Sequence, residues 1–293
     1  MPGNDKKNAP IIVFFTILLW GSAFPAIRVA LRWFEPFQLA SFRFFVASAA
    51  LIAFAVAAKI PFPKLPDVPA LLLSGAVGIG VYNLTLNTGQ KTVPAGMASL
   101  LINTAPIWTA IMAQILLRDR LSWKAWLGIF ISFIGVLIIV VKEGSGITLD
   151  RDALLVLIAS LSHSIYIVTM KRHIRNYGPI AATSYTLVAG TLCLAFFSHG
   201  LGSAIRQAPL SAVLLVIYLG LFPAAIAYLL WGHVLSFFPP ARAASFLYFV
   251  PLAAVVIAWI WIGETPTWRT LIGGVLVIVG VMLVNRKMEV AAT

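Results

Sequence analysis

Ten stretches of this chain run for about 20 residues with few or no charges, and each is long enough to cross a bilayer as a helix. Only 10% of the 293 residues are charged, whereas a soluble domain carries about 25%. The sequence therefore predicts an all-α, polytopic membrane protein. Its ten predicted spans are residues 10–31, 36–58, 68–89, 94–117, 123–141, 153–171, 179–200, 209–236, 240–262 and 267–285.

The composition excludes several classes of protein. Hydrophobic residues make up 61% of the chain, too many for polar groups to cover the surface of a cytosolic enzyme or a disordered protein. A net charge of +12 could indicate a nucleic-acid partner. However, the basic residues lie singly or in small groups between apolar runs, as in the loops of membrane proteins. We therefore expect a lipid bilayer and no nucleic acid as partners.

The distribution of Lys and Arg predicts the orientation in the membrane. With the N-terminus in the cytoplasm, twelve basic loop residues fall on the cytoplasmic side and seven on the other, leaving Arg43 and Arg242 aside. The first apolar run lacks a small-residue cleavage pattern, so we interpret it as a retained helix and not as a signal peptide. The expected location is a bacterial inner membrane, with both termini cytoplasmic.

An internal repeat relates the two halves of the chain. At an offset of 146, Tyr82 matches Tyr228, and the pattern Pro-Ala-x-x-Ala-Ser at 94–99 recurs at 240–245. Further pairs at an offset of 145 are Pro106 with Pro251, Asp119 with Glu264, Trp123 with Trp268, Gly128 with Gly273 and Gly135 with Gly280. Each half holds five predicted helices, and an odd number makes the second copy enter the membrane from the opposite side. Inverted repeats of this kind are typical of secondary transporters.

This repeat divides the chain into two similar units. We predict a cytoplasmic tail at 1–9, a first five-helix repeat at 10–145, a second at 146–286 and a cytoplasmic tail at 287–293. No connection is long enough to hold a soluble domain.

The motifs resemble those of the drug/metabolite transporter superfamily, in its ten-helix EamA-type branch. The resemblance is carried by Trp20-Gly21-Ser22-Ala23-Phe24, by the duplicated Pro-Ala-x-x-Ala-Ser pattern and by the end of each half. Each half ends on an acidic residue, Ser or Thr three residues later, and two glycines seven apart: Asp119, Ser122, Gly128 and Gly135, then Glu264, Thr267, Gly273 and Gly280. Within the superfamily, the sequence as a whole is most similar to bacterial (aromatic) amino-acid exporters. Helix six departs from helix one, because Ser162-His163-Ser164 stands where Trp20 would be expected.

The resemblance implies a function and a cavity. It implies export of small metabolites, foremost amino acids, by alternating access without a cofactor or metal. Helices one, three, four, six, eight and nine would line a weakly charged cavity, with helices five and ten at the periphery. Nucleobases, nucleosides or drug-like compounds remain alternative cargo, and a channel, a scramblase or a membrane-embedded enzyme remains an alternative class. The last lacks support from any His-x-x-x-His motif or intrahelical Asp pair. We expect a monomer or a weak dimer.

Charged residues within the spans are few. All nine carboxylates lie in loops, tails or at helix ends, which disfavours a carboxylate proton relay and a site for permanently cationic drugs. Arg43 lies about two turns inside helix two; it either binds an anionic substrate group or has a structural role by snorkelling to helix-end carbonyls. His163 either lines the cavity or bonds a neighbouring helix.

Neutral polar and aromatic residues supply the other candidates. Such groups could bind the carboxylate, ammonium and side chain of an amino acid, or could instead form interhelical hydrogen bonds. The residues expected to line the cavity are Trp20, Ser22, Tyr82, Asn83, Asn87, Ser99, Asn103, His163, Tyr166, Tyr228, Trp231, Ser245 and Tyr248. Pro106 and Pro251, at matching depths in helices four and nine, are expected to be hinges, because proline removes a helical hydrogen bond.

Overall fold

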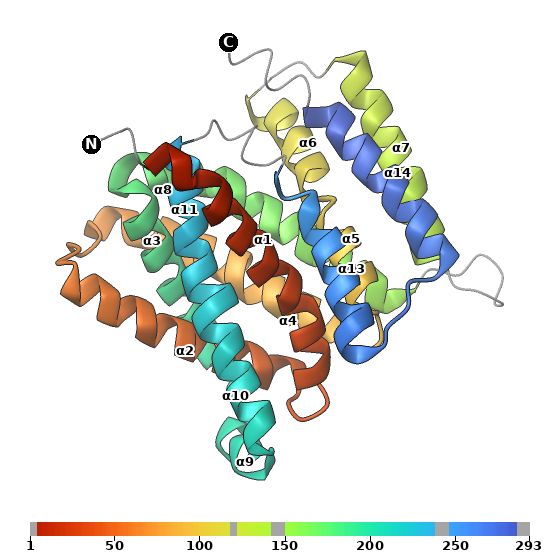
Figure 1. The fold of residues 1–293 in the computed structure, drawn as a ribbon. Helices are drawn as coiled ribbons and strands as arrows, with labels where there is room; N and C mark the ends of the chain where they lie inside the picture. The colour runs from red at the N-terminus through yellow and green to blue at the C-terminus, as the bar shows by residue number, and fades with distance from the viewer. Residues whose placement is uncertain (1–4, 118–121, 142–149, 238–245, 286–293) are drawn as a thin grey trace.

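The structure, a computed structural model, describes residues 5–117, 122–141, 150–237 and 246–285. These residues form helices and short connections (Figure 1). In chain order the helices are α1 Asp5–Ala30, α2 Pro36–Ala57, η1 Leu65–Asp67, α3 Val68–Gly75, η2 Ala76–Val81, α4 Tyr82–Gly89, α5 Ala95–Ile102, α6 Ala105–Leu117, α7 Trp123–Val140, α8 Arg151–Ala195, α9 Leu201–Gln207, α10 Leu210–Leu219, η3 Gly220–Ile226, α11 Ala227–Phe237, α13 Phe249–Ile262 and α14 Trp268–Asn285.

The all-helical prediction is confirmed for the described residues, and most predicted spans recur. Eight helical segments are long and apolar enough to cross a membrane, and two apolar helices, at Phe249–Ile262 and Trp268–Val284, are shorter. The first part of the predicted span 240–262 lies outside the described residues. The bounds agree closely at the start of α2, because Pro36 is the first residue of this helix and proline restricts the backbone locally.

The connection between the sixth and seventh predicted spans is helical, which corrects the prediction of a loop after residue 171. Helix α8 continues from Arg151 to Ala195, and only Gly178, with φ 78° and ψ 163°, interrupts it. The stretch before Gly178 is rich in Lys and Arg, which mark a loop by charge but have high helix propensity. Helix α8 also ends at Ala195, before the predicted end at residue 200, and the short helix α9 follows.

The fourth predicted span, 94–117, is two helices. Helix α5 ends at Ile102 and α6 begins at Ala105, so the break lies at Asn103 and Thr104, just before Pro106. Proline disfavours helical geometry in the residue before it and is well placed in the first turn of a new helix. In the second half, α13 begins at Phe249, two residues before Pro251.

Two π-helices interrupt the third and eighth spans at corresponding positions. The segment η2 lies between α3 and α4, and η3 lies between α10 and α11. Shifting η2 by the repeat offset of 146 gives residues 222–227, which overlap η3. The matched tyrosines lie at the starts of the following helices: Tyr82 is the first residue of α4, and Tyr228 is the second residue of α11. π-Helices are rare and occur mostly at functional sites, and nothing in the hydropathy pattern predicted them.

Helices α7 and α14 pack side by side at one flank of the bundle (Figure 1). A Cβ added at Gly135 would lie 2.6 Å from the Gly273 carbonyl oxygen, and one at Gly128 would lie 2.5 Å from that of Gly280. Gly135 thus meets the repeat counterpart of Gly128, and Gly128 meets the repeat counterpart of Gly135. The contacts therefore advance along α7 while they go back along α14. The equivalent helices of the two halves therefore contact each other antiparallel, at glycines that permit close approach.

Candidate functional site

Three aromatic rings meet where α1 crosses α11. The Trp20 ring lies 5.5 Å from Tyr228 in an edge-to-face arrangement and 5.4 Å from Trp231, measured between ring centroids. The Trp20 indole Nε1 donates to the carbonyl of Pro223 at 3.2 Å, which fixes the ring against η3. Such ring pairs add about 0.5–1.5 kcal/mol each beyond the burial of their area. All three rings are half-buried.

The corresponding residues of the other half form a second group of rings. Tyr82 lies 5.4 Å from His163, and His163 lies 6.2 Å from Tyr166 with near-parallel planes. The Tyr166 hydroxyl is 3.3 Å from the Thr186 hydroxyl. Tyr82 is the repeat counterpart of Tyr228, and His163 lies in the stretch that stands where helix one has Trp20. Each half therefore pairs a ring of its first helix with the matched tyrosine of the other half.

Arg43 of α2 lies near both groups. Its side chain is only 5% exposed, and Tyr82 and Tyr228 are both close enough to interact with it electrostatically. The guanidinium Nε donates to the carbonyl of Leu219 at 3.2 Å, and Nη1 donates to Asn83 Oδ1 at 3.4 Å. The sequence left two roles open for Arg43, binding of an anionic substrate group or a structural role, and Arg43 was not among the residues expected to line the cavity. Its depth within an apolar helix was the only signal.

We call these residues the central cluster: Trp20, Arg43, Tyr82, His163, Tyr166, Tyr228 and Trp231. They come from α1, α2, α4, α8 and α11. The cluster offers aromatic faces, hydroxyls, an imidazole and one buried cation. Within the described residues no ion pair joins Arg43 to a carboxylate. The arrangement suits a small molecule that has both an apolar surface and an anionic group.

The other predicted site residues lie outside the central cluster, and most of them form hydrogen bonds within their own helix or to a neighbouring one. The Ser22 hydroxyl lies 2.6 Å from that of Tyr218, and Asn87 donates to the Pro36 carbonyl at 3.1 Å. Ser99 is buried and donates within its own helix to Gly96. Asn103 lies at the α5–α6 break, whereas the hydroxyl of Tyr248 donates to the carbonyl of a residue in α14. Ser245 lies outside the described residues.

A polar network joins four helix ends beyond one side of the cluster. Arg28 Nε lies 3.1 Å from Glu264 Oε1, and the Arg28 Nη1 donates to the carbonyls of Gln90 and Lys91. The second carboxylate oxygen of Glu264 accepts from the Ala95 N–H at 2.8 Å, at the start of α5. Carboxylates are favourable at a helix N-terminus, so Glu264 connects the end of α13 to both α1 and α5.

Replacing Glu264 by glutamine should lower the free energy of unfolding by about 1–2 kcal/mol, because the Arg28 ion pair is only partly screened, with side chains 26% and 22% exposed. Thermal unfolding of E264Q, of Arg28→Gln and of the double variant should show strong non-additivity. Glu35→Gln is the matched control, since its pair with Lys91 is 54% and 44% exposed. Additive effects of E264Q and R28Q would contradict the network.

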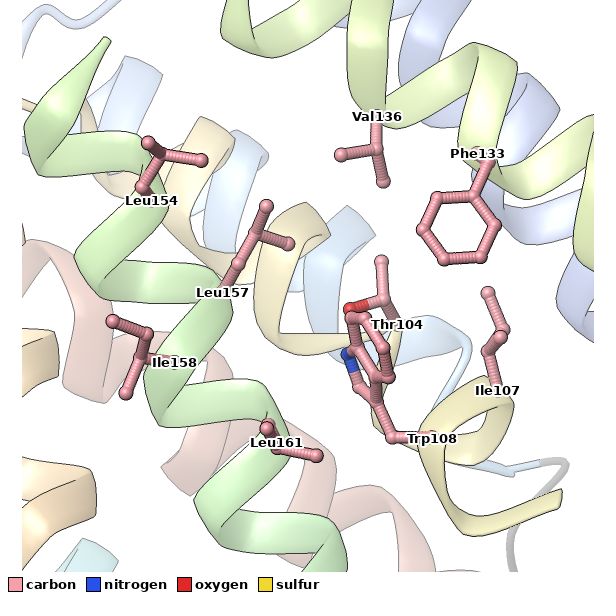
Figure 2. Close-up of a pocket in the computed structure, with 9 residues that line it drawn as sticks. All are labelled: Thr104, Ile107, Trp108, Phe133, Val136, Leu154, Leu157, Ile158 and Leu161. Atoms are coloured by element: carbon pink, nitrogen blue, oxygen red, sulfur yellow. The ribbon is translucent and has the colours of Figure 1, made fainter. Parts of the chain in front are cut away.

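An apolar cavity of 360 Å³ lies apart from the central cluster, between α6, α7 and α8 (Figure 2). Four α8 side chains form one wall, and Phe133 and Val136 of α7 form the opposite one. Thr104 and Trp108 lie at its base, with the Trp108 indole N–H lacking a partner among the described residues. The walls of this cavity consist mostly of apolar side chains, which suit the acyl chain of a lipid and not the polar groups of a metabolite.

Comparison with known proteins supports the arrangement of the chain in two repeats. The model of the EamA-like transporter family matches this chain twice, at residues 8–141 and 151–286. The uncharacterized transporter YdfC of Bacillus subtilis (strain 168) is 40% identical over 97% of this chain and 94% of its own length. A "Probable terminal-alkyne amino-acid exporter" of Streptantibioticus cattleyicolor is 36% identical over 93% of this chain and 91% of its own length.

More distant proteins extend the comparison. A "Probable amino-acid metabolite efflux pump" of Salmonella typhimurium is 26% identical over 95% of both chains. One solved crystal structure superposes with a TM-score of 0.64 at 20% identity, over 97% of this chain and 99% of that chain, and it shares the fold. The duplicated family match agrees with the paired π-helices and the antiparallel glycine contact. This chain is a multi-pass membrane transporter that belongs to the EamA-like transporter family.

Proposed function

We propose that this chain exports small neutral amino acids, aromatic ones included, across a bacterial inner membrane by alternating access. Ten spans in two inverted five-helix repeats would enclose the binding site, with both termini cytoplasmic. The observation that carries the proposal is the central cluster, in which the two halves of the chain meet in two equivalent ring pairs. Trp20 of the first half contacts Tyr228 of the second, and His163 of the second half contacts Tyr82 of the first. A site shared by two equivalent halves can be opened to either side by rocking one against the other.

The chemistry of the cluster fits an amino acid better than a highly charged metabolite. Aromatic faces provide walls for an apolar side chain and attract an ammonium group, and hydroxyl and amide groups add hydrogen bonds. Two relatives whose names refer to amino-acid export or efflux point to the same class of cargo. In this orientation the network around Arg28 and Glu264 closes the outer side.

The break in the fourth span provides a point of movement. At this break the Ser160 hydroxyl donates to the Ile102 carbonyl at 3.1 Å, and Ser164 donates to the Ala105 carbonyl at 2.7 Å. Helix α8 therefore supplies the hydrogen bonds that the interrupted backbone lacks, as non-helical segments in membranes require. Because these bonds come from side chains, the angle between α5 and α6 can change without unfolding either helix.

Pro106→Ala and Pro251→Ala should each reduce transport several-fold and leave the protein folded, because alanine allows a continuous helix across the break. Flux into proteoliposomes and monodispersity in size-exclusion chromatography are the two measurements. Pro209→Ala is the matched control, since Pro209 is the N-cap of α10 and interrupts no helix. Unchanged flux in both single variants would remove the hinge role.

The proposed function is tested by counterflow with the purified, reconstituted full-length protein. Radiolabelled phenylalanine, leucine and threonine are compared with adenosine and uracil, with and without a pH gradient. Saturable counterflow of the amino acids is the expected result. Counterflow of the nucleoside or nucleobase alone would move the proposal to that alternative, and unsaturable flux without counterflow would indicate a channel or scramblase.

A further inference from the structure

We infer that the guanidinium of Arg43 binds the carboxylate of the transported molecule, so that a free carboxylate is what this chain recognises in its substrates. The inference rests on the proposed function, because it places one group of the substrate within the central cluster. It goes beyond that function by naming the residue that selects an acid over its uncharged amide.

The first argument is the cost of burying Arg43. Arg43 is 5% exposed in the interior of α2, and the ion-paired carboxylates of the described residues, Glu35, Asp67 and Glu264, are all bound to other cations. Burying an arginine in the middle of a membrane protein costs free energy unless the arginine meets a counter-charge or a polar cavity. A substrate carboxylate would supply the missing negative charge during transport.

The second argument is the number of donors. A guanidinium carries five N–H groups in a planar fork, and the described residues supply two acceptors, the Leu219 carbonyl and the Asn83 amide oxygen. These acceptors engage Nε and Nη1, and Asn83 is itself fixed by a bond to the Ile79 carbonyl at 2.8 Å. The remaining N–H groups are available to a carboxylate, which guanidinium binds in bidentate geometry.

The third argument compares Arg43 with the residue at the equivalent position in the other half of the duplicated fold. Aligning Glu35-Pro36 with Gly178-Pro179 gives an offset of 143 for the second and seventh spans. Ser48 and Thr191, counterparts at this offset, meet each other at 2.7 Å, as residues on a symmetry axis should.

At the same offset the counterpart of Arg43 is Thr186. It links two parts of α8 by its bond to Tyr166, so a short neutral side chain is sufficient for the helix-linking role in the second half. The first half alone has a cation at this depth, which a purely structural role does not require.

The surroundings of Arg43 suit the rest of an amino acid. Tyr82 and Tyr228 are both within range of electrostatic interaction with the guanidinium, and the Phe44 ring lies 5.4 Å from its central carbon. Nδ1 of His163 is buried without a partner among the described residues, beside Tyr82. A neutral imidazole nitrogen and aromatic faces can accept the ammonium group, while Arg43 holds the carboxylate.

The test compares ligands that differ only in the charged groups. Counterflow of radiolabelled phenylalanine by the reconstituted full-length protein is inhibited with phenylalaninamide, which lacks the carboxylate, or with 3-phenylpropionate, which lacks the ammonium. In the unaltered protein, 3-phenylpropionate should compete at least about tenfold better than the amide, given the strength of charge-assisted hydrogen bonds.

Two variants then assign this preference to Arg43. Arg43→Gln removes the charge, and Asn83→Asp leaves Arg43 in place but occupies its fork with a carboxylate of the same shape. Both should lose the preference for the acid and most phenylalanine transport. N83D loses the bond from Nδ2 to the Ile79 carbonyl but gives the buried Arg43 a counter-charge, so it should fold even if R43Q does not. Arg206→Gln, at an exposed arginine of α9, is the matched control and should transport normally.

The outcomes separate the two proposals. If phenylalanine is transported but its amide competes equally well, or if folded R43Q or N83D keeps the preference for the acid, the role of Arg43 is wrong and the amino-acid exporter stands. If no amino acid is transported and adenosine is, the proposed function fails, and the carboxylate site fails with it.

Discussion

Gly135→Leu should abolish the folded state, and Gly273→Leu should do the same. A Cβ at Gly135 would lie 2.6 Å from the Gly273 carbonyl oxygen, and one at Gly273 would lie 2.7 Å from that of Gly135. Neither obstacle is the flexible end of a side chain, so α7 and α14 would have to separate along their length. Overpacking typically costs about 1–3 kcal/mol, and a forced separation of backbones should reach or exceed that upper value. Thermal unfolding and the yield of monodisperse protein measure the effect.

Gly202→Leu is the matched control for these variants. Gly202 also lies in a helix, α9, but an added Cβ there meets nothing within 4 Å, so the substitution should be neutral. The double variant G135L/G273L should be little worse than either single variant, because both damage one shared contact. Additive losses, or a normal melting temperature for G135L, would show that the two helices do not pack through these glycines.

The second large effect is expected at Tyr228. Its ring contacts Trp20 and packs against two separate groups of core residues, one around Phe44 and one around Tyr166. Tyr228→Ala should lower transport by about tenfold or more, since the ring contact with Trp20 and the packing against both core groups are lost together and their sum exceeds the free energy of a tenfold change. Counterflow of phenylalanine into proteoliposomes provides the measurement.

Two further variants separate the ring of Tyr228 from its hydroxyl and from general damage to the helix. Tyr228→Phe keeps the ring contacts and should retain most of the transport rate. Phe222→Ala removes an aromatic ring from the adjacent π-helix, outside the central cluster, and should leave transport close to normal. If Y228A transports normally, or if F222A is as damaging, the central cluster is not the binding site.

The spans could be predicted because burial in lipid imposes a property on every residue of a helix. Pro36 and Pro209 mark helix starts by local geometry alone, and the structure places α2 and α10 where the sequence did. The helical continuation after residue 171 could not be predicted from hydropathy, because that scale reads Lys and Arg as loop residues while their backbones remain helical.

The site was predictable only in part, because sequence spacing does not reveal which residues of different helices meet. The repeat singled out Tyr82 and Tyr228, and the structure places Tyr82 beside His163 and Tyr228 beside Trp20. Asn87 and Ser99 have the same residue chemistry as cavity-lining groups, yet their hydrogen bonds are made to the backbone of α2 and α5. For Arg43 the sequence left a binding and a structural role open, and only the tertiary structure brings it within electrostatic range of both tyrosines.

The paired π-helices have a consequence for the history of the chain. One additional residue in a helical turn rotates everything beyond it by about 100° relative to an uninterrupted helix. Without it, Tyr82 and Tyr228 would face another direction, and a one-residue deletion within η2 or η3 should have that result. Since both copies carry the same irregularity at overlapping positions, the insertion is older than the duplication. The single ancestral repeat already had it, and its two descendants have kept their tyrosines in phase.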